Sequence, residues 1–151
     1  MPSSLRQAVF TTLKTLLDER MHTAHTAMQA AQESANSEGK SSAGAKYETA
    51  RAMGQLDRDM YARQYETARQ ERHLLERLGH VPPAVRVVPG SLVRTAAGLF
   101  LVSVSAGKIT VEGQTVIAVS AQSPVGALLL GKRVGEIILF QKKETAVLEI
   151  T

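Results

Sequence analysis

The stretch SEGKSSAGAKYE, Ser37–Glu48, decides how the first half of this 151-residue chain is organised. It is rich in Ser, Gly and Ala, and it lies between two long segments with helical periodicity. Gly39, Gly44 and the serines disfavour helix. A flexible linker or a plain solvated turn has the same composition. Because short connections between long helices are typical of antiparallel packing, we interpret the stretch as the turn of a helical hairpin.

Apolar residues on both sides of this stretch recur every three or four positions, which predicts two amphipathic helices. The first helix is expected at about 3–35, with a stripe formed by Leu5, Val9, Leu13, Leu16, Leu17, Met21, Ala24, Met28 and Ala31. The second is expected at about 45–78, with a stripe formed by Ala50, Met53, Leu56, Met60, Leu74, Leu75 and Leu78. Such helices would be roughly 45–50 Å long, and neither can bury its stripe alone. We therefore predict an antiparallel coiled coil with its tip near residues 37–48.

The composition changes sharply near Gly79–Pro83. Helix formers dominate before this point, whereas Val, Ile, Thr and Gly dominate after it in short alternating runs. Because the paired prolines end a helix, we predict a hairpin at 1–79 and a second domain at 80–151. Strands are expected at 84–88, 91–95, 98–105, 108–113, 115–121, 136–140 and 145–150, which predicts a small antiparallel sheet.

One short helix is expected to interrupt this sheet. Ser123 is a good N-cap, Pro124 suits the first helical position, and Gly131 can end the helix. The three leucines at 128–130 are expected to pack on the sheet. The fold class is therefore predicted to be α+β.

The overall composition narrows the classes of function. The chain has no cysteine, so it forms no disulfide and holds no thiolate-bound metal. No apolar run approaches the roughly 20 residues of a membrane span, and we expect a cytoplasmic protein with no membrane partner. The formal net charge is +4 and aromatic residues make up 4%, which does not favour direct sequence-specific nucleic-acid binding.

The segment SAQSPVGALLLGKRVGEIILF, residues 120–140, resembles the C-terminal domain of the Gre transcript-elongation factors. The shared features are a Ser-Pro step, a short apolar helix, then Leu-Leu-Gly-Lys, Val-Gly-Glu and a closing pair of strands. The tip pattern of the family is echoed by Gly39, Ala45, Tyr47, Ala50 and Arg51. The resemblance covers almost the whole chain. It implies an FKBP-like fold for the second domain, without isomerase activity.

The resemblance also implies a partner, bacterial RNA polymerase. Members of the family pass the coiled coil down the polymerase's secondary channel, so that the tip reaches the catalytic magnesium. In members that stimulate transcript cleavage, two tip carboxylates help to hold a second magnesium ion for a two-metal phosphoryl transfer. Magnesium requires oxygen ligands, and anionic ones suit it best.

The tip departs from the family at the two acidic positions, which fall on Lys40 and Ala43. Neither residue can bind magnesium, and Lys40 adds a positive charge. Glu33, Glu38 and Glu48 are nearby acids, and Glu38 could substitute if the hairpin shifts by a residue or two. The candidate partner-binding residues at the tip are Glu38, Lys40, Ser41, Ser42, Ala43, Tyr47 and Glu48.

Other chemistry is weakly indicated. His22 and His25 have helical spacing, with His73 on the second helix, but no further metal ligand is evident. Ser123 has no nearby base and is interpreted as a cap rather than a nucleophile. We therefore expect no enzyme activity, no metal and no cofactor.

We predict a polymerase-binding factor that fills the secondary channel and modulates transcription without stimulating cleavage. Two further functions stay open as alternatives to this first one. The second is a cleavage factor of the Gre type that uses Glu38. The third is a coiled-coil interaction module unrelated to transcription, with self-association through the hairpin.

Overall fold

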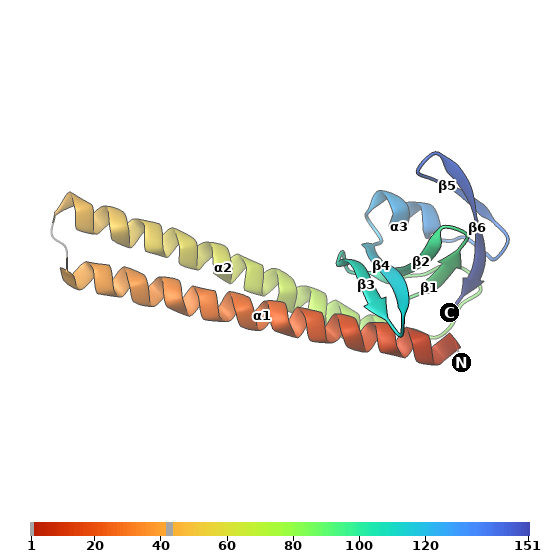
Figure 1. Ribbon diagram of the computed structural model, residues 1–151, viewed down its shortest axis with the longest axis horizontal. Coiled ribbons are helices and arrows are strands. Elements are labelled where there is room, and N and C mark those ends of the chain that lie inside the picture. Colours follow the sequence, from red (N-terminus) through yellow and green to blue (C-terminus); the bar gives the residue numbers. More distant parts are fainter. Residues whose placement is uncertain (1, 42–43) are drawn as a thin grey trace. The chain divides into compact units, whose positions relative to one another are not determined.

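The fold is α+β, as the sequence predicts, with two long helices followed by a six-stranded sheet and a short helix (Figure 1). The computed structural model describes the backbone of residues 2–41 and 44–151 and the side chains of residues 5–37 and 46–151. Its compact units are the hairpin unit, Thr15–Arg72, and the sheet unit, Met1–Lys14 with His73–Thr151. The predicted domain boundary, between residues 79 and 80, lies just after the end of the second helix rather than at the boundary of these units. It stays a prediction.

The hairpin unit is an antiparallel pair of helices, α1 (Pro2–Ser41) and α2 (Ala45–Leu78). Arg72 Nε donates to Asp18 Oδ1 at 3.0 Å, and the rings of His25 and Tyr65 lie 6.0 Å apart. In both pairs the two residue numbers add up to 90. A residue n of α1 therefore lies at the same height along the hairpin as residue 90 − n of α2. The two helices therefore keep one register along this unit.

The connection between the helices is shorter than the predicted turn, Ser37–Glu48. Helix α1 continues to Ser41, and α2 already begins at Ala45. A single glycine costs a helix interior only about 1 kcal/mol, so Gly39 does not end α1.

The predicted stripe of α1 is confirmed, but the middle of the α2 stripe is wrong. Met53, Leu56 and Met60 are 57%, 64% and 38% exposed. At this level the two helices meet through small residues instead, because a Cβ added to Gly54 would lie 2.6 Å from Ala35 Cβ. The seam of a coiled coil drifts by about 20° per heptad around a straight helix. A residue such as Met53, about three heptads before Leu75, would share a face with Leu75 on a straight helix. Because of the drift, it no longer lies in the seam.

The sheet unit contains strands β1 (Leu92–Thr95), β2 (Gly98–Ser103), β3 (Gly107–Val111), β4 (Gln114–Ser120), β5 (Ile137–Phe140) and β6 (Lys143–Ile150). Their order in the sheet is β3-β4-β2-β1-β6-β5. Neighbouring strands are antiparallel except β2 and β4, which are parallel. The expected sheet is thus confirmed as mostly antiparallel. The parallel pair arises because β3 folds back onto β4, which places β4 beside β2.

The strand expected at 84–88 is wrong. In this segment the structure has only a single bridge between Arg86 and Arg133. Pro82, Pro83 and Pro89 flank the segment and carry no N–H group for a ladder of hydrogen bonds. Its valine-rich sequence therefore does not produce a strand.

The short helix α3 (Pro124–Leu129) has the predicted cap. The Ser123 hydroxyl accepts a hydrogen bond from the backbone N–H of Gly126 at 3.1 Å, and Pro124 occupies the first turn. Leu129 is fully buried, whereas Leu128 is 41% exposed. A helix of six residues has one buried face, so only part of the predicted leucine cluster packs inward.

The core of the sheet unit is formed by buried residues from β1, β2, α3, β5 and β6 and by Val87, namely Val87, Val93, Phe100, Val102, Leu129, Ile138 and Val147. The rings of Phe100 and Phe140 meet edge to face with centroids 5.4 Å apart. Among the described residues, no helix is long and apolar enough to cross a membrane.

Arg6 links the ends of the two helices within the sheet unit. Its Nε and Nη2 atoms donate to the carbonyl oxygens of Gly90 and Leu78 at 3.1 and 3.0 Å, and Nη1 donates to Gly79 O at 3.4 Å. The guanidinium also lies 4.7 Å from the centre of the Phe10 ring. Desolvation by burial lowers the pKa of Arg6 from its usual value. The guanidinium therefore satisfies carbonyl groups at the end of α2 that have no helical partner.

Candidate functional site: the hairpin

The part of the predicted tip contributed by α1 is only partly described. The backbone of Glu38, Lys40 and Ser41 belongs to the last turns of α1. The side chains of these three residues, and the whole of Ser42 and Ala43, lie outside the described residues. The structure therefore places the backbone of three candidate residues at the end of a helix. What their side chains can bind is inferred from residue identity alone.

The part of the tip contributed by α2 is described in full from Lys46 onward. Gly44 has a φ of +74°, a left-handed conformation that glycine adopts without strain, and its carbonyl accepts from the Glu48 N–H at 3.2 Å. Arg51 Nη1 donates to the hydroxyl of the half-buried Tyr47 at 3.2 Å. Glu48 is exposed in the first turn of α2, where a carboxylate interacts favourably with the helix dipole. Glu48 thus has a structural role whether or not it meets a partner.

His22, His25 and His73 are not grouped as metal ligands in the described part of the chain. All three are exposed, and the His25 ring lies beside that of Tyr65. Over the whole described part of the chain, no three His, Asp or Glu side chains are grouped so that they could hold a metal ion.

A groove of about 650 Å³ lies along one side of the hairpin unit, between α1 and α2. Ala24 and Ala68 are buried at its floor, and Leu16 and Met60 lie at its two ends. The groove is bordered by both signs of charge, from Glu19, Arg20, Arg63 and Glu71. A narrow apolar floor with charged borders suits a protein surface better than a small polar ligand.

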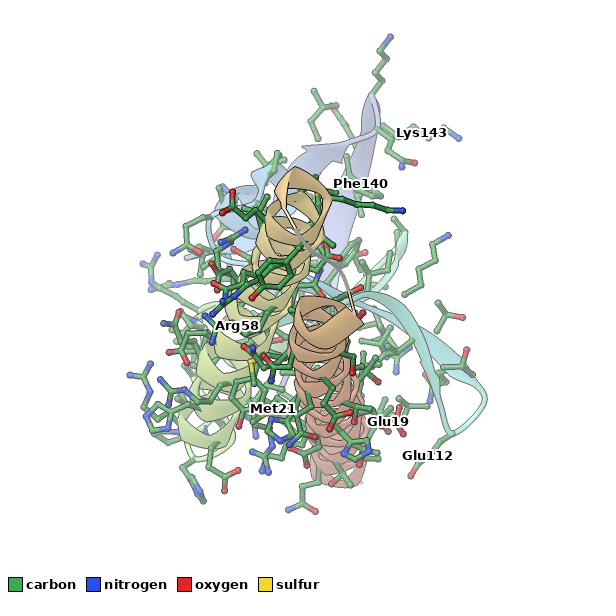
Figure 2. All side chains as sticks on the ribbon, turned by 90° about the vertical axis from the view of Figure 1, so that its left-hand side faces the viewer. Glu19, Met21, Arg58, Glu112, Phe140 and Lys143 are labelled. Carbon is green, nitrogen blue, oxygen red and sulfur yellow. The ribbon has the colours of Figure 1, made fainter. Side chains whose placement is uncertain are left out.

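The two acids that border the groove differ in burial: Glu71 is partly buried and Glu19 is exposed. Burial raises the pKa of the Glu71 carboxyl, and the nearby Arg20 guanidinium opposes this shift. Glu19 is exposed at the outer border of α1, and Figure 2 shows it on the opposite side of the helix from Met21. The groove is thus lined by one acid from each helix, Glu19 from α1 and Glu71 from α2.

The sequence interpretation missed this groove. It assigned Leu16 and Met60 to the seam between the helices, whereas both border the groove and Met60 is 38% exposed. The drift of the seam could have revealed it. Residues spaced i, i+3, i+7 on a straight helix move farther from the interface with increasing distance from Leu75.

The sheet unit offers two further surface features. A cavity of about 340 Å³ is lined by Arg6 together with Val81, Pro82 and Ile150, but the nitrogens of Arg6 already bond to three carbonyls. On the edge strand β5 and its neighbour β6, Ile137, Leu139 and Leu148 are each more than half exposed. Exposed apolar residues on an edge strand are typical of a contact surface.

No family model matches this sequence, and no curated protein matches it.

Proposed function

We propose that this protein binds bacterial RNA polymerase, passes its hairpin into the secondary channel, and modulates transcription without supplying carboxylates to the catalytic magnesium. The observation that carries the proposal is the hairpin. Helices of 40 and 34 residues run antiparallel and are joined by only a few residues. Within the hairpin unit alone they extend for roughly 40 Å, at 1.5 Å per residue.

The seam supports the proposal because it makes the outer half of the hairpin narrow. Gly54 lies so close to Ala31 and Ala35 that a methyl group would not fit between the helices. A pair of helices packed through small residues is the thinnest rod that two helices can make. Such a rod suits entry into a channel.

The tip sequence supports the absence of cleavage chemistry. The resemblance to the Gre factors places its two acidic positions at Lys40 and Ala43, which cannot bind magnesium. The side chains that replace them are a cation and a methyl group. Steric occupation of the channel then remains as the mode of action.

The exposed apolar residues on β5 and β6 support a docking role for the sheet unit. Ile137, Leu139 and Leu148 would be covered by a partner's surface, which removes apolar area from water at about 25 cal/mol per Å². In the proposal, this contact contributes affinity and the hairpin contributes the effect on transcription.

A photo-crosslinking experiment tests the proposal. A photoreactive amino acid is placed at Glu48, which is exposed near the tip, and the full chain is added to a stalled elongation complex. The expected crosslink joins position 48 to the polymerase subunit that holds the catalytic magnesium. The matched control carries the same group at Glu112, an exposed residue next to β3. Crosslinks to that subunit from position 112 and none from position 48 would overturn the proposal.

A transcript-cleavage assay on a backtracked complex separates this proposal from a Gre-type cleavage factor. We expect no stimulation of cleavage by the full chain. Stimulation that disappears in a Glu38→Ala variant would show that Glu38 replaces the missing acids, and the proposed steric mode would then be wrong.

A further inference from the structure

The groove side of the hairpin unit carries charges in an order that fits a second copy of the same chain. On α2, Arg63 lies four residues before Thr67 and Glu71 lies four residues after it, and all three residues line the groove. Residues four apart on a helix lie on the same face. A two-fold axis at Thr67, with the two α2 helices antiparallel, therefore brings Arg63 of each copy opposite Glu71 of the other.

The centre of this face can be approached closely. By the register of the hairpin, Thr67 of α2 is level with Thr23 of α1, and both line the groove. The buried Ala24 and Ala68 lie next to them in sequence. These side chains are small at the axis itself, and the longer side chains of Arg20 and Gln64 line the groove on either side of it.

The ends of the face are apolar. Met60 is 38% exposed on α2, and Leu56 continues the apolar stripe beyond it at 64% exposed. Leu16 lines the groove on α1. Apolar ends, a small centre and opposite charges at equal distances from that centre make the face complementary to itself, as a two-fold contact requires.

We propose that the hairpin unit self-associates through this groove side as an antiparallel two-fold dimer, with Arg63 of each copy opposite Glu71 of the other. The inference does not rest on binding to polymerase. It assigns a partner to Met60 and to the groove beside it, which the fold of one chain leaves exposed.

The size of the face sets the strength of the dimer. Its length from Leu16 to the level of Met60 is roughly 20 Å, and two helices are roughly 20 Å wide. About 400 Å² of each copy, or about 800 Å² in total, lies below the standard size of a stable interface. We therefore expect a weak dimer, with a dissociation constant of about 10–100 μM.

Sedimentation equilibrium of the full chain at low salt, from about 5 to 500 μM, measures this dissociation constant. Arg63→Glu and Glu71→Lys each turn two attractive charge pairs into repulsive ones, so each should weaken the dimer by about tenfold or more. Arg69→Glu is the matched control. It makes the same change of charge on the same helix, but Arg69 is exposed, bonds to Glu66 and does not line the groove.

Mixing the two variants tests the arrangement itself. In a heterodimer of Arg63→Glu with Glu71→Lys, the two substituted side chains face each other at one end, with their charges exchanged but still opposite. The other end keeps the original pair of Arg63 with Glu71. We expect the mixture to dimerise about as well as the original chain, although each variant alone dimerises poorly.

Circular dichroism checks that both variants keep their helices. A monomer at about 500 μM, well above the expected dissociation constant, would overturn the proposal. An equal loss with Arg69→Glu, or no recovery on mixing, would overturn it as well.

Discussion

Gly126 shows how one residue without a side chain decides the packing of α3. A Cβ atom at this position would overlap the carbonyl oxygen of Ser120, which also accepts a hydrogen bond from the Ser123 hydroxyl at 2.7 Å. The capping serine and Gly126, in the first turn of α3, therefore both pack against the carbonyl of Ser120 at the end of β4. Only glycine fits there.

We expect Gly126→Ala to lower the free energy of unfolding by about 2 kcal/mol or more, because overpacking costs about 1–3 kcal/mol and a backbone carbonyl cannot move aside easily. The gain in helix propensity, up to about 1 kcal/mol, is smaller than this cost. Urea unfolding measures the difference. Ala127→Ser, at the exposed neighbour in the same helix, is the control and should change stability by less than about 1 kcal/mol. Equal effects of both changes would contradict this packing.

The packing of α1 against α2 includes a close approach at Gly54, where an added Cβ would lie 2.6 Å from Ala35 Cβ. We expect Gly54→Leu to force the helices apart and to lower the stability of the hairpin by about 1–3 kcal/mol. Gln55→Leu places the same side chain on the exposed neighbour and should leave the hairpin stable. Hydrogen exchange of the α1 amides around Ala35 reports the local loss, while circular dichroism follows helix melting. Unchanged protection in Gly54→Leu would show that the seam does not depend on this close contact.

The elements that depend on local sequence could be predicted, and those that depend on packing could not. The two long helices and the Ser123 cap of α3 follow from periodicity and from a single hydrogen bond, both of which lie within a few residues. The exposure of Met53 depends on the drift of the seam over several heptads, which no short window contains. The segment at 84–88 was predicted as a strand, but it pairs with the rest of the sheet unit only through a single bridge, between Arg86 and Arg133. The parallel pairing of β2 with β4 depends on where the β3–β4 hairpin folds back.

The candidate site divides in the same way. The sequence predicted the hairpin tip near residues 37–48, and the connection between α1 and α2 lies within that range. It did not locate the groove, because Arg63, Glu71 and Leu16 come together only when both helices are placed. A site built from two elements needs their register, which the contacts of Asp18 with Arg72 and of His25 with Tyr65 supply.

At the scale of the whole molecule, the two proposals concern the same hairpin. A pair of hairpins packed side to side is about twice as thick as one hairpin, since each helix adds about 10 Å. A channel that admits two helices would not admit four. Self-association and channel binding would therefore exclude one another, and protein concentration would set the share of free hairpin.

The decisive measurement is the binding of the full chain to core RNA polymerase, at protein concentrations below the expected dimer range. A chain shortened by one heptad in each helix, at residues 29–35 and 55–61, keeps the register of the seam and shortens the rod by about 10 Å. We predict that the full chain binds with a dissociation constant of about 10 μM or tighter, and that only the full-length hairpin changes transcription. No binding at about 10 μM, the lower end of the expected dimer range, or the same effect on transcription from the shortened hairpin, would contradict a role in the secondary channel.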